Sequence, residues 1–436
     1  MLSMAVVLTT GVKTGANAAT KVTLTVQSYF ESGNPLETYI ETLGKEFEKA
    51  HPNVTVKFTS IAAFGQYNSI ILQEALTKTV PDIMMADNPS VPQLIKAGAY
   101  KDITAKVKQW GISNWQDFYK GQQDVTSSNG KIYAFQITNN NCALFYRKSL
   151  LKKAGIANPP ATWAELEADC KKIKQVLGIY GFAFTADASE EATWQFEPFL
   201  WSNGGSLLEL DQPKAIQALQ FLTDMVKKGY VSKDVLNTTG QGDPTQWFIN
   251  GQAPFMVNGD WEFDWHLTKD VMKKLGDVGV APLPVPQKGM TLVVPFGGEC
   301  FGISSNIAAA KYDLAFQFLE SMVTSTNQLK LNTASDAGLP TRVSVAKKLL
   351  LVKPILKVFL DQAQHALARP LMGGMDKYPN VSSYTWTAIQ KAFSGQATPA
   401  QAFKEAAGKI RKLFSSADYE KYKQQARTLL LAASKK

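Results

Sequence analysis

The sequence has few residues of the kinds that hold metals or form redox centres. Its 436 residues include three cysteines, Cys142, Cys170 and Cys300, and three histidines that lie far apart. The cysteines form no Cys-x-x-Cys pair and the histidines no His-Glu-x-x-His spacing, so neither a zinc site nor a redox motif is predicted. The odd count leaves two outcomes open: one disulfide with a leftover thiol, or three buried free thiols. We expect no metal and no cofactor.

Long apolar runs and long runs of like charge are also missing. After the N-terminal segment, no stretch reaches the roughly 18 apolar residues that a membrane span requires. The net charge is +9, but the lysines are scattered along stretches with helical periodicity, and basic and aromatic residues do not alternate. This pattern favours solvated helix faces over a nucleic-acid surface, so we expect no nucleic-acid partner.

The N-terminal segment has features of an export signal. Residues 1–10 contain an apolar run, and the Ala-Asn-Ala-Ala stretch at 16–19 fits a cleavage site of small residues. The positive charge expected before the apolar run is missing, since Lys13 follows it. We predict a signal peptide at 1–19 and an exported protein, periplasmic or extracellular, with no transmembrane span in the mature chain.

Apolar and aromatic residues are abundant and fall into alternating strand and helix patterns. The hydrophobic content of 45% is typical of a globular protein, and the length is enough for two cores. Residues 21–28, 54–59 and 83–86 have strand patterns, with helical patterns between them at 36–50 and 66–76. This order predicts an α/β fold with mainly parallel sheets flanked by helices.

The most informative segment is 247–261. Two Asn-Gly pairs, at 250–251 and 258–259, bracket a short apolar strand. Asn-Gly is a strong turn signal because both residues tolerate positive φ. The second turn would present Asp260 and Trp261 at the end of a buried strand, where open α/β sheets bind ligands. A flat ring beside a carboxylate suits a sugar, although a core Trp with a surface Asp is equally consistent with the spacing alone.

This segment resembles a signature of the extracellular solute-binding proteins of ABC sugar importers, in the family of the maltose-binding protein. In that family the tryptophan after the second glycine stacks on a sugar ring, which implies this role for Trp261. Arg147 stands before Lys148, so one motif of the family is only approximately kept. Further stretches that resemble family motifs, in the same order, are 81–83, 144–147, 159–163 and 338–342.

The resemblance implies two lobes of the type II periplasmic-binding-protein kind, hinged by crossover strands. Lobe one would comprise 20–136 and 302–342, and lobe two 137–301 and 343–430, with 431–436 as a tail. Residues 135–141 and 296–301 would be the crossovers. The lobes would close on a small carbohydrate ligand, and the transmembrane subunits of an ABC permease would recognise the closed form. A monomer without enzymatic activity is expected.

Candidate ligand contacts lie at strand ends and crossovers. Sugars bind through aromatic faces and through planar polar groups that take paired hydroxyls. For each polar candidate, a role as helix cap or turn former is about as consistent, and for Arg369 a local salt bridge is slightly favoured. The candidates are Trp261, Asp260, Tyr29, Phe30, Glu31, Phe64, Asp87, Asn88, Asn139, Asn140, Trp201, Phe296, Gly297, Gly298, Glu299 and Arg369.

Two other functions stay open. A solute other than a sugar, such as a glycerol-phosphate-like ester or a polyamine, could occupy the same fold. The second is a carbohydrate-active enzyme, with Asp260 and either Glu262 or Asp264 as acid and base. The enzyme hypothesis requires the strand to continue beyond Asp260, so that the two carboxyls face the same side. No second cluster of acidic residues in the sequence indicates another catalytic partner.

Overall fold

The computed structural model describes residues 21–30, 33–61, 64–334 and 338–435. The predicted signal peptide and Glu31 lie outside these residues. Within them, none of the helices has the length and apolar character needed to cross a membrane.

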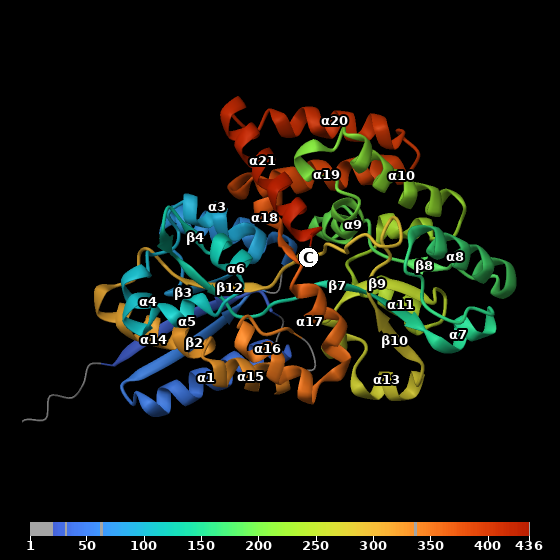
Figure 1. Cartoon of the computed structure of the whole chain (residues 1–436). Helices are drawn as coiled ribbons and strands as arrows, with labels where there is room; N and C mark the ends of the chain where they lie inside the picture. Colours follow the sequence, from blue (N-terminus) through green and yellow to red (C-terminus); the bar gives the residue numbers. More distant parts are fainter. Residues whose placement is uncertain (1–20, 31–32, 62–63, 335–337, 436) are drawn as a thin grey trace, which may run out of the picture.

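One lobe is built on a five-stranded sheet with the order β2-β1-β3-β12-β6. β1 pairs in parallel with β2 and β3, whereas β12 is antiparallel to β3 and β6. β1, β3 and β6 run toward the other lobe, and β12 enters from there and runs away from it (Figure 1). We call this part lobe one; its strands are β1 (Val22–Ser28), β2 (Val54–Ser60), β3 (Ile83–Asp87), β6 (Ala134–Gln136) and β12 (Glu299–Ile303).

The other lobe is built on a four-stranded sheet with the order β10-β7-β9-β8. β7 is antiparallel to both β9 and β10, and β8 is parallel to β9. The predicted α/β class is confirmed, but the sheets are mixed and not mainly parallel, since three of these seven strand pairings are parallel. The antiparallel pairs arise where crossover strands enter each sheet. We call this part lobe two; its strands are β7 (Cys142–Arg147), β8 (Phe182–Ala183), β9 (Phe255–Gly259) and β10 (Val278–Ala281).

Helices pack around both sheets, with lobe one on the left and lobe two on the right of Figure 1. The helices of lobe one are α1 (Pro35–Ala50), α2 (Phe64–Thr77), α3 (Val91–Lys96), α4 (Thr104–Trp110), α5 (Ile112–Gln116), α6 (Lys120–Val125), α14 (Ala309–Met322) and α15 (Ser325–Ala334). Those of lobe two are α7 (Lys148–Lys153), α8 (Trp163–Leu177), α9 (Glu190–Ser202), α10 (Pro213–Lys227), α11 (Gly242–Ile249), α12 (Glu262–Trp265) and α13 (Lys269–Leu275). The C-terminal part forms α16 (Val343–Val352), α17 (Lys357–Ala363), α18 (Arg369–Met372), α19 (Tyr378–Phe393), α20 (Pro399–Arg411) and α21 (Ser416–Ala433).

The lobe-two sheet is buried on both faces, which the alternation along β7 makes clear. Cys142 and Leu144 pack into one apolar core with helices that include α8, α9 and α19. Ala143 and Phe145 point to the opposite face, into a core with residues of α11 and α17. Successive residues of a strand face opposite sides, so a strand covered on both sides is apolar throughout.

The chain crosses between the lobes in segments that pair with one another. Isolated bridges join Asn140 to Gly297 and Asn139 to Leu339. Nearby, β11 (Pro295–Phe296) pairs in parallel with β13 (Leu367–Ala368). Ala368 and Leu371 belong to the core of lobe one, although residues 343–430 were predicted to join lobe two. The C-terminal part therefore passes over lobe one before α19, α20 and α21 pack on lobe two.

All three cysteines are free and buried, so the second of the two outcomes left open by the sequence is found. Burial raises the pKa of each thiol well above its ordinary value. In the part of the chain that the structure describes, no three His, Cys, Asp or Glu side chains are grouped so as to hold a metal ion.

Candidate functional site

A cavity of about 600 Å³ lies between the two lobes. Tyr29 and Asp87, at the ends of β1 and β3, line it from lobe one. Residues of the crossovers form a further part of its wall, and lobe two contributes the start of α9, the loop before α11 and the residues after β9. The volume lies within the range of about 300–1,000 Å³ that is usual for small-molecule sites.

Aromatic side chains make up part of the wall. The lining rings are those of Tyr29, Phe30, Trp194, Trp261 and Trp265. The indoles of Trp194 and Trp261 lie with their ring centroids 6.2 Å apart at an interplanar angle of 45°. Trp194 is only 3% exposed and Arg369 lies over its ring, so Trp261 is the indole of this pair that can offer an apolar face to a flat ligand.

Gly259 is required by the position of the Trp261 ring. A Cβ atom at this residue would lie 2.0 Å from Cζ3 of Trp261, so only glycine allows the indole to lie there. The predicted second turn is wrong, because Asn258 and Gly259 end strand β9 and Gly259 has no positive φ. The first Asn-Gly pair does form a turn, in which Gly251 has a φ of 73°.

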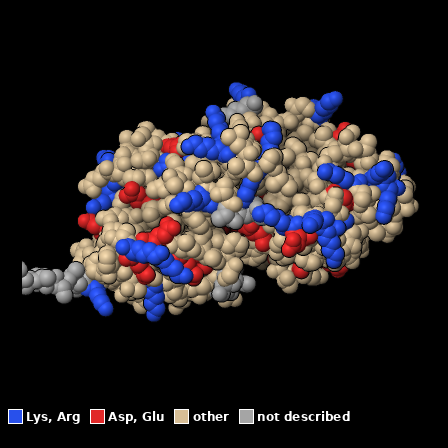
Figure 2. All heavy atoms as spheres, turned by 90° about the horizontal axis from the view of Figure 1, so that it is seen from below, with Lys and Arg blue, Asp and Glu red and all other residues tan. Residues whose placement is uncertain are grey.

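The cavity is acidic although the chain as a whole is basic. Lys and Arg side chains are spread over the face of the molecule seen in Figure 2. Arg369 and His266 are the basic residues in the described lining. Eight acidic residues line the cavity: Asp87, Glu190, Glu191, Asp243, Asp260, Glu262, Asp264 and Glu299.

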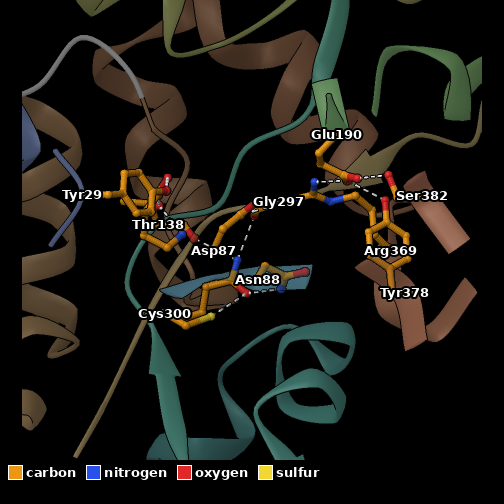
Figure 3. Close-up of polar contacts among 12 residues, drawn as sticks. Tyr29, Asp87, Asn88, Thr138, Glu190, Gly297, Cys300, Arg369, Tyr378 and Ser382 are labelled. Carbon is orange, nitrogen blue, oxygen red and sulfur yellow. Dashed lines mark hydrogen bonds and ion pairs between the residues drawn. The ribbon is translucent and has the colours of Figure 1, made fainter. Parts of the chain in front are cut away.

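Arg369 joins the two lobes through two of these carboxyls. Its guanidinium donates to Glu190 at 2.6 Å and to Asp87 at 3.2 Å (Figure 3). It also lies 4.5 Å from the ring centroid of Trp194. Burial lowers the pKa of Arg369, but Asp87 and Glu190 more than offset this and keep the pKa above its ordinary value. Tyr378 also donates to Glu190, at 2.6 Å. The salt bridge favoured for Arg369 was a local one, and this prediction is wrong: its partners lie 179 and 282 residues away, and all three residues line the cavity.

Glu299 is held at the second crossover by hydroxyl groups. Tyr29 donates to one of its carboxyl oxygens at 3.0 Å, and the Thr138 hydroxyl donates to the other. The backbone N–H of Glu299 in turn donates to the Thr138 hydroxyl at 3.1 Å. Burial, with a further contribution from Asp87, raises the pKa of Glu299 to about 7. Burial likewise raises the pKa of Asp87 to about 6, even though Arg369 opposes it.

Asp260 has a structural role that neither sequence interpretation included. It is fully buried, and its carboxylate accepts the backbone N–H of Asn141 at 3.2 Å and that of Gly338 at 2.9 Å. It thereby ties the end of β9 to the first crossover and to the loop before α16. Burial raises its pKa to about 7, although both of these hydrogen bonds lower it. The neighbouring Glu262 accepts from Asn258 at 3.0 Å and contacts Nδ1 of His266 at 2.8 Å.

Nine of the predicted contacts line the cavity. They are Tyr29, Phe30, Asp87, Asn139, Asn140, Asp260, Trp261, Glu299 and Arg369. Phe64 begins α2 without a described side chain, and Glu31 falls outside the described residues. Residues predicted in the loop after β1, at the end of β3 and in both crossovers are therefore found at the cavity.

The remaining candidates lie elsewhere. Trp201 is only 2% exposed and packs in the core of lobe two. It follows Trp194 by two turns of α9, about 10 Å further along the helix, which carries it past the cavity wall. Asn88 is fully buried and donates to Gln136 at 2.8 Å. Phe296 lies in the core of lobe one.

The two glycines of the second crossover act through the backbone. Gly298 has a φ of 132°, and a Cβ there would lie 2.1 Å from the Thr138 carbonyl oxygen. At Gly297 a Cβ would lie 2.6 Å from Oδ1 of Asn140. Neither glycine lines the cavity. Each allows the crossover chains to approach closely, which a side chain would prevent.

Sequence reasoning missed the start of α9 and the loop before α11. Glu190, Glu191 and Trp194 line the cavity, as do residues 239–243. Ser189 caps α9, its hydroxyl accepting from the Glu191 N–H at 3.1 Å, and two acids follow in the first turn. That pattern is typical of any helix start, so nothing in it indicates a cavity.

Comparisons with known proteins agree with this geometry. The model of the family described as bacterial extracellular solute-binding protein matches residues 42–353. A multiple sugar-binding protein of Streptococcus mutans is 24% identical over 320 residues, covering 70% of this chain and 72% of the relative. A Deinococcus radiodurans protein named as a probable ABC transporter-binding protein is 26% identical over 299 residues, covering 65% and 69%.

Solved structures share the fold. Maltose-bound MalE3 of T. maritima has a TM-score of 0.79 and 27% sequence identity, with 90% of this chain and 100% of that chain covered. A solute-binding protein of Thermotoga lettingae with α-D-tagatose has a TM-score of 0.78 and 24% identity, with 90% and 99% covered. The family match spans well over half of the chain, so the resemblance seen in the motifs is confirmed: this chain belongs to the bacterial extracellular solute-binding proteins.

Proposed function

We propose that this protein captures a carbohydrate in the cavity between its lobes and delivers it to an ABC-type membrane importer. The observation that carries the proposal is the pair of indoles, Trp194 and Trp261, beside carboxyls that neighbouring residues hold in place. Aromatic faces under the C–H surface of a sugar, with fixed acceptors for its hydroxyls, are what carbohydrate recognition requires. The S. mutans relative is named for sugar binding, and the T. maritima structure contains maltose.

In this proposal the side chains divide into stacking and hydrogen-bonding groups. Trp261 stacks on a sugar ring, with Trp194 beside it. Tyr29, Glu299 and Asn140 bind hydroxyls from the base of the cavity. Arg369 and Asp260 act mainly on the protein itself, since their polar groups already contact Asp87, Glu190 and backbone N–H groups.

We further propose that the lobes, 20–136 with 302–342 and 137–301 with 343–430, close on the ligand about the crossovers. The ligand binds the closed state better because only there do both lobes reach it, and this difference in affinity drives the closure. The closed monomer, exported after loss of residues 1–19, would then meet the permease subunits outside the cytoplasm.

The two alternatives are less well supported. The family consists of solute-binding proteins and not of enzymes. A general acid has to reach its substrate, whereas both Asp260 oxygens accept backbone N–H groups and Glu262 contacts Asn258 and His266. A phosphate ester would meet a wall with eight carboxyls. Neutral or cationic solutes fit this wall better.

A thermal-shift screen over mono-, di- and trisaccharides, sugar alcohols, phosphate esters and polyamines tests the proposal, followed by calorimetry on each hit. Trp261→Ala should weaken binding of the sugar that stabilises the protein. Trp247→Ala is a matched control, since Trp247 is half-buried and lies outside the cavity lining. Stabilisation by phosphate esters or linear polyamines alone would contradict the proposal, and turnover of a labelled oligosaccharide would favour an enzyme.

A further inference from the structure

The carboxyls of the cavity carry more negative charge than the cavity's own cations can balance. Of the eight lining carboxyls, Arg369 pairs with two, Asp87 and Glu190, and Asp264 also has an interaction partner, which leaves five. His266 contacts one of these five, Glu262. Asp260 and Glu299 accept hydrogen bonds from neutral N–H and O–H groups, which stabilise a carboxylate without cancelling its charge. No lysine is found in the described lining.

The excess negative charge is concentrated on the part of the cavity wall that lobe two forms. Glu191 lies in the first turn of α9, Glu262 begins α12, and Asp243 lies at the start of α11. One carboxyl oxygen of Glu191, Oε2, is buried and has no hydrogen-bond partner among the described residues. It faces Gly240, a lining residue at which a Cβ would lie 3.4 Å away. Burial, with Asp187 and Glu262 close by, raises the pKa of Glu191 to about 8.

Two buried amides add unsatisfied acceptors to the cavity. Asn139 is 2% exposed and Asn332 is 1% exposed, both line the cavity, and Oδ1 of each has no partner within the described chain. On the donor side, the same is true of Nε of Arg369 and the indole N–H of Trp194. A ligand that satisfies this wall must be rich in donors but must also offer some acceptors.

From these observations we propose that the preferred ligand is a sugar that carries a free amino group, with its ammonium bound by Glu191 on lobe two. This inference rests on the proposed function of the same cavity and specifies the class of carbohydrate. An ammonium supplies three donors and one positive charge, which matches a partly unsatisfied carboxyl next to a second acid. The hydroxyls of the same sugar supply both donors and acceptors to Asn139, Asn332 and Trp194.

The aromatic wall selects a sugar over a linear amine. A polyamine chain would meet the charge requirement but has no ring face to cover Trp261. A neutral sugar can stack, yet it leaves the buried carboxyls either charged without a counterion or protonated. A uronic acid or sugar phosphate adds repulsion to that cost. An amino sugar meets both requirements.

Matched ligand pairs test the inference. Glucosamine, galactosamine and the β-1,4-linked glucosamine dimer would each be titrated by calorimetry against the N-acetylated form and the parent neutral sugar, at pH 7.5 and low salt. We expect each binding amine to bind about 10- to 100-fold more tightly than its N-acetylated form, as one or two charge-assisted hydrogen bonds imply. In buffers of different ionisation enthalpy, binding of the protonated sugar should release protons, because an ammonium stabilises the charged form of Glu191, which has Asp187 and Glu262 close by.

Variants separate this inference from the proposed function. Glu191→Gln keeps the shape of the side chain and should remove most of the preference for the amine, measured as the ratio of the affinities for the amine and its N-acetylated form. Glu209→Gln is the control, since Glu209 pairs with Arg427 away from the cavity lining. Equal or tighter binding of the neutral partners to the unmodified protein would overturn the inference and leave sugar capture standing. Binding of linear polyamines but of no sugar would overturn both, and failure of every amino sugar to bind would overturn the inference.

Discussion

Replacing Arg369 by methionine should destabilise the folded protein strongly. The guanidinium is 4% exposed and pairs with Asp87 at the end of β3 and with Glu190 at the start of α9, so it holds the two lobes together. Methionine keeps much of the apolar stem but leaves two carboxyls facing each other without a cation. Removing one partner of a buried ion pair costs about 3–5 kcal/mol, a large part of the roughly 5–15 kcal/mol that stabilises a typical domain.

Urea denaturation followed by circular dichroism measures this loss. Arg411→Met is the matched control, because Arg411 is 43% exposed and pairs with Asp211 on the surface, where such a pair is worth about 0–1 kcal/mol. The loss of stability in Arg369→Met should be smaller at pH 5 than at pH 8. The pKa of Asp87 is already raised to about 6, so at pH 5 protonation removes its uncompensated charge. Adding Asp87→Asn should restore part of the stability. Equal, small losses in both arginine variants would refute the reasoning.

Four further outcomes are expected. Trp261→Ala should weaken sugar binding at least tenfold, because stacking and buried area of one ring contribute about 1.5–3 kcal/mol; unchanged affinity by calorimetry would remove Trp261 from the site. Gly259→Ala should weaken binding similarly, because its Cβ would displace the Trp261 ring; a crystal structure with the ring in place would contradict this. The ligand-free protein should melt at a lower temperature at pH 8 than at pH 5. The pKa values of Asp260 and Glu299 are each about 7 in the folded protein, above their unfolded values, so the stability present in acid is lost as the pH rises from about 4 to 7. A melting temperature that does not change over this pH range would exclude this. Finally, the correct ligand should reduce the radius of gyration in small-angle scattering without a change in circular dichroism, whereas an unchanged radius at saturation would favour a rigid pocket.

Local sequence patterns predicted the elements of lobe one better than the joints between lobes. The alternation over β1 and β2 and the apolar run of β3 identify these strands, because each pattern reflects burial of the strand itself. No local pattern exists for the direction of β12, which pairs with β3 more than 200 residues away, or for the pairing of β11 with β13, about 70 residues apart. For the same reason, the packing of Ala368 and Leu371 on lobe one could not be foreseen.

Prediction of the site succeeded where a residue follows a strand and failed where it begins a helix. Tyr29, Asp87 and Trp261 come after β1, β3 and β9, and strand ends in this fold point to the cavity. Glu191 and Trp194 lie in the first turns of α9, where acids are common for reasons of helix stability alone. Asp260 was placed at the cavity, but its partners, Asn141 and Gly338, are distant in sequence, and no local pattern pairs them with it.

The burial of all three thiols has a practical consequence for optical measurement. Maleimide dyes react with exposed thiolates, so Cys142, Cys170 and Cys300 should stay unmodified in the folded protein without being replaced. Thr239 is exposed and lines the cavity, so Thr239→Cys would offer a single reactive position at its rim. A fluorophore attached there would change its emission when a solute enters. The natural sequence is therefore already prepared for conversion into a reagentless biosensor.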